Sequence, residues 1–221
     1  MSLTPEQQSV IQKTADHVRQ VFGNEGSGHD WWHMKRVWEN AKRIGQAEGA
    51  DMFIVELGAL LHDIADWKDH DGDLTVGPKV AGEWLSSLGV EPAIVKKIQY
   101  IVANVSFKGA GVKNGMSTLE GKVVQDADRL DAIGAIAVAR TFTWGGSRGR
   151  LLYDPDFKPE MHQSFEAYKN STSSSLHHFY EKLFLLKDMM NTATGKQLAE
   201  DRDRFMHQFV DQFLAEWDGR R

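Results

Sequence analysis

The sequence predicts an all-α protein, and three observations support this prediction. Apolar residues recur at spacings of three and four along most of the chain, which is the period of a helix. The alternation of apolar and polar residues that is typical of half-buried strands is almost absent. The 221 residues include only 5 prolines and are 41% hydrophobic, which suits one globular domain built as a helical bundle.

Capping residues mark where the N-terminal helices begin. Thr4 precedes Pro5 and stands three residues before Gln7, the pattern of a capping box with proline in the first turn. Asp30 and Asp51 precede the next two segments of helical periodicity. The segment after Asp51 is apolar on nearly all sides, which is typical of a central helix. These signals predict helices over about 5–22, 31–48 and 52–65.

Breaker residues and periodicity define the remaining helices. The Gly-Val-Glu segment at 89–91 separates two periodic segments, and the Gly-containing segments 107–117 and 145–159 are expected to be loops. The Ser-rich cluster at 171–175 and Thr194 are expected to cap the last two helices. The expected helices cover about 76–88, 92–105, 119–144, 176–190 and 195–217.

The composition excludes several classes of protein. The formal net charge is -5, whereas a nucleic-acid-binding domain usually shows a basic face. Cys is absent, which excludes disulfides, thiolate metal sites and a Cys nucleophile, and fits a reducing cytoplasm. The N-terminus lacks the basic and apolar regions of a signal peptide, and no apolar run is long enough to span a membrane. We therefore expect a cytoplasmic protein that binds neither nucleic acid nor membranes.

Four ionisable side chains stand at positions that the helical pattern predicts to be buried: His33, His62, Asp63 and Asp128. Burying such a group is costly unless the group is paired or bound to a metal. Two imidazoles and two carboxylates suit one divalent ion, which would be Mn²⁺, Mg²⁺, Fe²⁺, Ni²⁺ or Zn²⁺. A buried network of salt bridges is the alternative that these residues leave open.

Three further residues near these positions are candidates for catalysis or substrate binding. Asp66 follows His62 by four residues and is expected to project from the same helical face, where a carboxylate can orient or deprotonate a water. Asp131 lies one turn after Asp128 and can bind the substrate or position a ligand. Arg129 can meet phosphate oxygens or pair with an acid.

The pattern His…His-Asp…Asp resembles that of the HD superfamily of metal-dependent phosphohydrolases, and more closely that of its bacterial single-domain YedJ/YpgQ-like subfamily. The resemblance implies a helical fold with an HD core at about 25–135 and a C-terminal helical extension at about 145–221 packed on it. It covers nearly the whole chain. The motifs that carry it lie at 28–33 (GHDWWH), 61–66 (LHDIAD), 124–134 (VQDADRLDAIG), 178–183 (HFYEKL) and 195–199 (GKQLA).

The resemblance also implies a chemistry. By position, His33, His62, Asp63 and Asp128 match the metal ligands, and Asp66 matches an acidic residue that assists water. The implied reaction is hydrolysis of a nucleotide phosphoanhydride, in which a (d)NTP gives the monophosphate and pyrophosphate, with Mn²⁺ favoured. A nucleoside 5′-monophosphatase and a non-catalytic sensor of nucleotides or metal are the alternatives.

The segment between the His-Asp pair and the last Asp narrows the expected site. HD phosphodiesterases with two metals carry extra histidines in this segment. Here His70 is the only histidine between Asp63 and Asp128, which favours a single ion. A small phosphorylated substrate, most simply a nucleotide, is the expected partner, and the sequence is compatible with a homodimer. The candidate substrate contacts are His29, Lys108, Arg129, Asp131 and Lys182.

Overall fold

The computed structural model describes residues 3–23, 30–65, 73–107, 115–160, 166 and 173–221. The regular elements in these ranges are helices, with no strand among the described residues, which confirms the predicted all-α helical bundle. The chain divides into two compact units, one formed by residues 1–106 with 114–128 and the other by 107–113 with 129–221. The expected single domain, with an extension packed on an HD core, stays a prediction.

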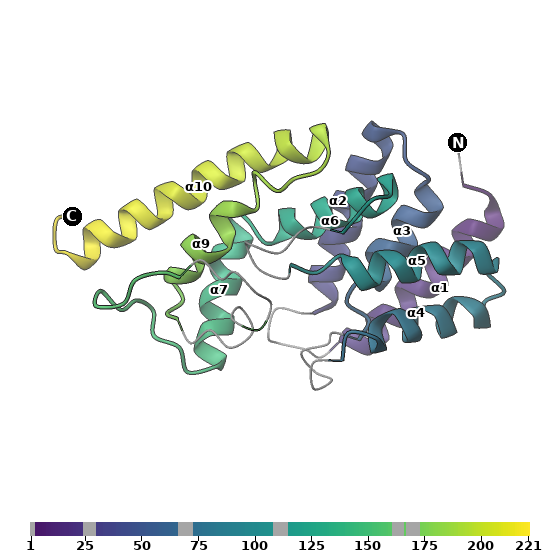
Figure 1. The fold of residues 1–221 in the computed structure, drawn as a ribbon, viewed down its shortest axis with the longest axis horizontal. Coiled ribbons are helices and arrows are strands. Elements are labelled where there is room, and N and C mark those ends of the chain that lie inside the picture. Colours follow the sequence, from purple (N-terminus) through teal and green to yellow (C-terminus); the bar gives the residue numbers. More distant parts are fainter. Residues whose placement is uncertain (1–2, 24–29, 66–72, 108–114, 161–165, 167–172) are drawn as a thin grey trace. The chain divides into compact units, whose positions relative to one another are not determined.

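The first unit is organised around one apolar helix, α3, which packs against α1, α2 and α5 (Figure 1). Every residue of α3 from Phe53 to Leu61 is buried, as expected for a central helix. Helices α4 and α5 also pack together. The helices of this unit are α1 (Pro5–Phe22), α2 (Trp31–Glu48), α3 (Met52–Leu61), α4 (Val76–Ser87), α5 (Pro92–Asn104) and most of α6 (Leu119–Asp131).

The predicted N-terminal caps of the first three helices are confirmed. The Thr4 hydroxyl accepts a hydrogen bond from the backbone N–H of Gln7, and the Gln7 side chain accepts one from the backbone of Thr4. The Asp30 and Asp51 carboxylates cap α2 and α3 by accepting from the backbone N–H groups of His33 and Phe53. These bonds satisfy N–H groups that have no partner within the helix, so the sequence fixes where each helix begins.

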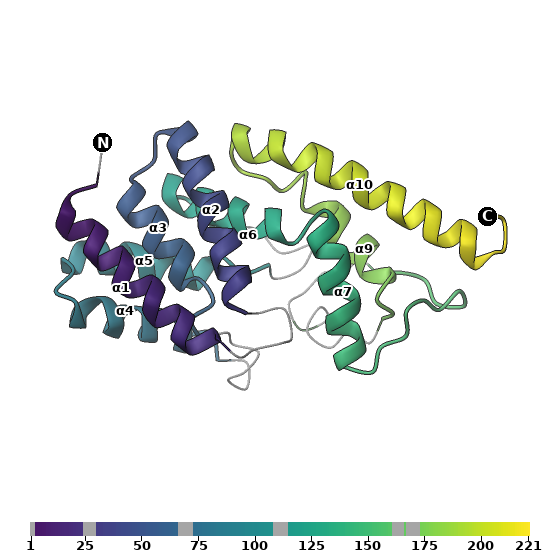
Figure 2. The same ribbon diagram turned by 180° about the vertical axis from the view of Figure 1, so that it is seen from behind.

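The second unit places the long helix α10 against α7, and Figure 2 shows α10 in yellow beside α7 and α9. Phe142 of α7 lies within 5.9–6.2 Å, between ring centroids, of three aromatic rings, those of Phe179, Phe209 and Phe213. The elements of this unit are α7 (Ala135–Ser147), α9 (His177–Glu181), η2 (Leu183–Leu185) and α10 (Ala193–Trp217). No helix in the described ranges is long and apolar enough to cross a membrane.

The predicted helix over 119–144 is wrong, because the structure has two helices there. Helix α6 ends at Asp131 and α7 begins at Ala135. Between them Gly134 has φ 88° and ψ -162°, a conformation essentially restricted to glycine. A Cβ atom at Gly134 would lie 3.1 Å from the side chain of Arg202, so this residue is held in a close contact as well.

Three other helix boundaries also differ from the prediction. Helix α3 ends at Leu61, and residues 62–65 form turns in which the N–H of Ile64 donates to the carbonyl of Leu61. The helix expected over 176–190 is interrupted at Lys182, whose φ of -141° is not helical. The last helix is capped by Thr192 rather than Thr194, since the Thr192 hydroxyl accepts from the N–H of Gly195.

Helix α3 buries one carboxylic acid. Glu56 is 7% exposed, and its Oε2 atom accepts a hydrogen bond from the indole Nε1 of Trp38 on α2 at 2.8 Å. Burial raises the pKa of Glu56 above its ordinary value, and the bond from Trp38 and the charge of Lys42 only partly offset this effect.

Replacing Glu56 with glutamine is expected to remove a pH dependence of stability. Because the pKa of Glu56 is raised in the folded protein, the folded state binds more protons than the unfolded state from about pH 4.5 upward, and stability falls as pH rises. The stability of Glu56→Gln relative to the wild type should therefore increase between pH 5 and pH 8 in urea unfolding.

Glu6→Gln is the control for this effect, with the opposite sign. Hydrogen bonds from its own backbone and from Thr4 lower the pKa of Glu6, so its contribution to stability appears as pH rises. The relative stability of Glu6→Gln should accordingly decrease as pH rises toward about 4.5, and it should stay constant between pH 5 and pH 8. A difference between Glu56→Gln and the wild type that does not change with pH would contradict the assignment.

Candidate metal centre

The structure brings the four candidate ligands together within the first unit, where the two histidines are buried as predicted and the two aspartates are partly exposed. His33 is the third residue of α2, His62 is the C-cap of α3, Asp63 follows it, and Asp128 lies on α6. The His62 Nε2 atom lies 3.4 Å from Asp63 Oδ2 and 3.7 Å from Asp128 Oδ1. The His33 Nε2 atom lies 3.6 Å and 3.8 Å from the same two oxygens.

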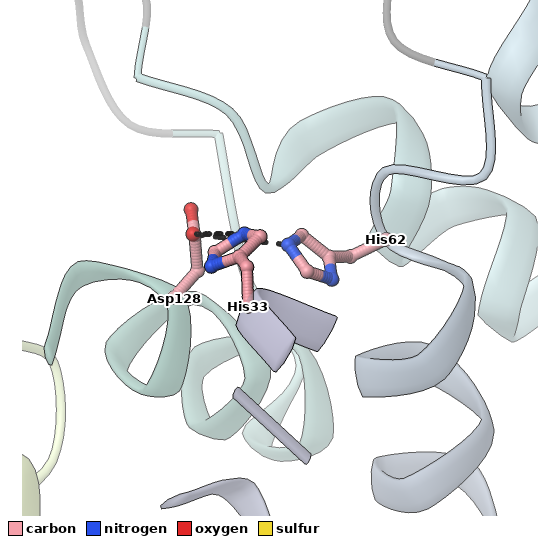
Figure 3. Close-up of side chains that lie close together, drawn as sticks. All are labelled: His33, His62 and Asp128. Carbon is pink, nitrogen blue, oxygen red and sulfur yellow. Dashed lines mark ion pairs between the residues drawn. The ribbon is translucent and has the colours of Figure 1, made fainter. Parts of the chain in front are cut away.

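Three of these side chains form a cluster of metal-ligand type. One donor atom from each of His33, His62 and Asp128 lies within 4.8 Å of the others. Figure 3 shows the three side chains pointing toward one another, from α2, from the turn directly after α3 and from α6. The imidazoles are 2% and 0% exposed, whereas the Asp63 and Asp128 carboxylates are 15% and 27% exposed. The cluster therefore has a buried imidazole side and a carboxylate side that solvent can reach.

The tautomer of His62 directs a lone pair toward the carboxylates. Its Nδ1 atom lies 2.8 Å from the carbonyl oxygen of Ala59, which can only accept, so Nδ1 carries the proton of the neutral ring. Its buried Nε2 atom has no hydrogen-bond partner among the described residues. A nitrogen lone pair that faces two carboxylates is unfavourable unless a cation lies between them. The hydrogen bond from Nδ1 to the Ala59 carbonyl is also typical of histidines that bind a metal through Nε2.

The distances also favour a shared ion over direct salt bridges. A hydrogen bond between a charged nitrogen and a carboxylate is about 2.7–2.9 Å long. Ligand atoms about 2.1 Å from one ion lie about 3.0 Å apart in octahedral and about 3.4 Å apart in tetrahedral coordination. The four nitrogen–oxygen distances, 3.4–3.8 Å, are too long for direct bonds and are closer to those of a shared ion.

Local structure positions the helices that carry these residues. The Asp30 carboxylate accepts from the backbone N–H of His33 at 2.8 Å, so the cap of α2 also holds the backbone of a candidate ligand. The amide of Gln125, three residues before Asp128, donates to the carbonyls of Asn104 and Val105 at 3.1 and 3.2 Å. These bonds hold α6 against the end of α5.

The other predicted site residues are distributed differently. Asp66, His29 and Lys108 lie outside the described residues. The helix whose face was expected to present both His62 and Asp66 ends at Leu61, before His62, and residues 62–65 form turns.

Three candidate substrate contacts have partners within the second unit. Arg129 is 5% exposed, and its guanidinium donates to the carbonyl of Met189. Asp131 pairs with Arg140 at 2.7 Å. The Lys182 ammonium lies 5.4 Å from the ring centroid of Phe107.

Sequence reasoning missed two hydrogen bonds near the candidate ligands. The Ala59 carbonyl orients His62. The available signal was a histidine at the end of a helix, three residues after Ala59, because the last carbonyls of a helix have no partner within it. The bond from Trp38 to Glu56 links α2 to α3. Its signal was the single acidic residue within the apolar run of α3.

The helical fold is that of HD-superfamily hydrolases, and the comparisons with known proteins agree. The HD domain family pattern matches residues 31–133. YpgQ of Bacillus subtilis (strain 168) is 41% identical over 204 residues, which are 91% of this chain and 91% of YpgQ. The chain therefore belongs to the HD domain family, and the resemblance seen in the sequence is confirmed.

Solved structures share the fold over almost the whole chain. A protein from Lactobacillus plantarum is similar with a TM-score of 0.84 and 37% identity, covering 99% of this chain and 100% of that chain. An HD-superfamily hydrolase from Bacillus thuringiensis is similar with a TM-score of 0.73 and 44% identity, covering 96% of this chain and 98% of that chain. The structure of Bacillus subtilis YpgQ in complex with ADP is similar with a TM-score of 0.72 and 37% identity, covering 93% of this chain and 96% of that chain.

Proposed function

We propose that this protein is a metal-dependent phosphohydrolase that converts a (d)NTP to the monophosphate and pyrophosphate. The observation that carries the proposal is the convergence of two buried imidazole nitrogens on two carboxylates at 3.4–3.8 Å. The complex of the relative YpgQ with ADP supports a nucleotide as the substrate class. The absence of Cys fits a cytoplasmic location, which we propose as well.

The proposed metal ligands are His33, His62, Asp63 and Asp128. Their mixed nitrogen and oxygen atoms suit Mn²⁺, which we favour, and also Mg²⁺, Fe²⁺, Ni²⁺ or Zn²⁺. When bound, a divalent ion supplies a water with a pKa lowered toward about 7 and positive charge that offsets that of the phosphate oxygens.

The chain's own residues would carry out the remaining steps. Asp66 would accept a proton from the attacking water as its oxygen bonds to the α-phosphorus. The bond between that phosphorus and the bridging oxygen would break, and pyrophosphate would leave. The Ala59 carbonyl would keep the His62 ring in one orientation and tautomer. We propose His29, Lys108, Arg129, Asp131 and Lys182 as the residues that contact the substrate.

Product analysis tests this proposal against its two rivals. The Mn²⁺-loaded protein should release pyrophosphate from dNTPs, which ³¹P NMR distinguishes from inorganic phosphate. Inorganic phosphate from dNMPs, without pyrophosphate from dNTPs, would instead identify a 5′-monophosphatase. Nucleotide binding without turnover across the four dNTPs and dNMPs would identify a sensor.

Replacing Asp66 with alanine is expected to lower kcat by about 10²–10⁴-fold, the usual contribution of a positioned general base. Metal affinity should stay close to that of the wild type, because Asp66 is not a proposed ligand. Parallel measurements of kcat and of Mn²⁺ affinity separate the two effects. An unchanged kcat would remove Asp66 from the mechanism.

A further inference from the structure

A polar bond connects α2, which carries His33, to α3, which ends directly before His62. The indole Nε1 of Trp38 donates to Oε2 of Glu56 at 2.8 Å. The other buried residues of α3 are apolar, so a carboxylic acid at this position lies in an unfavourable environment. Because the hydrogen bond from Trp38 only partly offsets the cost of burying this acid, general stability is a poor explanation for Glu56.

The position of this bond along the helices relates it to the metal centre. Helices α2 and α3 are joined by only three residues, 49–51, and form an antiparallel helical hairpin. His33 lies five residues before Trp38 and His62 lies six residues after Glu56, which corresponds to about 7.5 Å and about 9 Å along the two helices. The hydrogen-bonded pair and the histidine pair therefore share one register of α2 against α3.

The indole is also held on the side of α2. The Lys42 ammonium lies 5.0 Å from the centroid of the Trp38 ring, one turn further along the helix. Glu39 in turn holds Lys42 at 3.0 Å and Lys35 at 3.4 Å. This arrangement restricts the indole, so its N–H keeps a defined direction toward α3.

We propose that Trp38 and Glu56 are positioning residues, whose hydrogen bond sets the register of α2 against α3 and so holds His33 and His62 at the spacing that a metal ion requires. This role rests on the proposed function. A slip of one residue moves a helix by about 1.5 Å. A hydrogen bond does not tolerate such a slip, because its useful range is about 2.7–3.2 Å.

Four single variants test the positioning role. Trp38→Phe removes the donor and keeps an aromatic ring under Lys42, while Glu56→Leu removes the acceptor. Glu56→Gln keeps an oxygen that can accept the bond. The matched control is Trp84→Phe, because the Trp84 indole also donates, to the Thr14 hydroxyl at 3.0 Å, but links α1 to α4, which carry no candidate ligand.

The measurements are the Mn²⁺ affinity of chelator-stripped protein, the visible absorption of the Co²⁺ form, and stability in urea. We expect Trp38→Phe and Glu56→Leu to weaken Mn²⁺ binding by about 10–100-fold, as loss of a supporting residue does at other metal sites, and to change the Co²⁺ spectrum. Glu56→Gln should bind Mn²⁺ within about threefold of the wild type. Trp84→Phe should lose stability without any change in affinity or spectrum.

The possible failures are distinguishable. Wild-type Mn²⁺ affinity in folded Trp38→Phe would overturn the positioning role alone. A loss of affinity in Trp84→Phe equal to that in Trp38→Phe would also overturn it, since the effect would then be one of general stability. If the wild-type protein binds no Mn²⁺, the proposed metal centre fails and the positioning role fails with it.

Discussion

Replacing Asp63 with alanine is expected to abolish tight metal binding and hydrolysis while leaving the helices folded. Asp63 Oδ2 lies 3.4 Å and 3.6 Å from the two imidazole nitrogens, so the substitution removes one of the four proposed ligands. Loss of a residue that only supports a ligand costs about 10–100-fold in metal affinity, and loss of a ligand should exceed about 100-fold. Asp63 lies in the turn after α3, so the helical content should not change.

Mn²⁺ titration and thermal unfolding measure this effect. An ion present at 100 times its Kd adds about 2.7 kcal/mol to the stability of the wild type, and this gain should disappear in Asp63→Ala. Asp16→Ala is the control, because Asp16 is an exposed residue of α1 in the same unit. Metal affinity and turnover in Asp63→Ala that match the wild type would contradict the proposed centre.

Replacing Gly134 with alanine is expected to destabilise the second unit substantially. Its backbone conformation, with φ 88° and ψ -162°, costs about 1–3 kcal/mol for a residue with a side chain. The added Cβ would also lie 3.1 Å from the Arg202 side chain, whose guanidinium donates to the carbonyl of Leu130. The midpoint of urea unfolding should therefore fall.

Gly146→Ala is the matched control for this substitution. Gly146 lies in α7, and beyond its chain neighbours and the backbone of its own helix a Cβ atom there would meet nothing within 4 Å. Alanine is favoured over glycine in a helix by about 0.5–1 kcal/mol, so the same chemical change should stabilise the protein at this position. Equal effects at Gly134 and Gly146 would contradict the account of the break between α6 and α7.

The parts of the fold that local sequence determines could be predicted. The caps at Thr4, Asp30 and Asp51 depend on side chains within three residues of the groups that they satisfy. The convergence of His33 and His62 was predictable because ionisable groups at buried helical positions need a common partner. The caps used information contained in a short segment, whereas the convergence of the two histidines used the burial predicted for two separate segments.

The parts that depend on distant residues could not be predicted. The break at Gly134 is accompanied by a close contact with Arg202 on α10, and glycine alone is compatible with a helix. The interruption at Lys182 coincides with the contact between its ammonium and Phe107, which is far away in the sequence. The acidic residue Glu56 within an apolar helix indicates that a hydrogen-bond donor lies nearby. That Trp38 is this donor depends on how α2 and α3 pack together, which the sequence does not show.

The number of ions bound per chain, measured together with nucleotide hydrolysis, tests the central claim most directly. Chelator-stripped protein should be inactive, and added Mn²⁺ should restore pyrophosphate release in proportion to the metal bound, up to one ion per chain. Full turnover by the stripped protein would contradict the claim that His33, His62, Asp63 and Asp128 act through a metal. Activity that requires a second ion per chain would contradict the single-ion site.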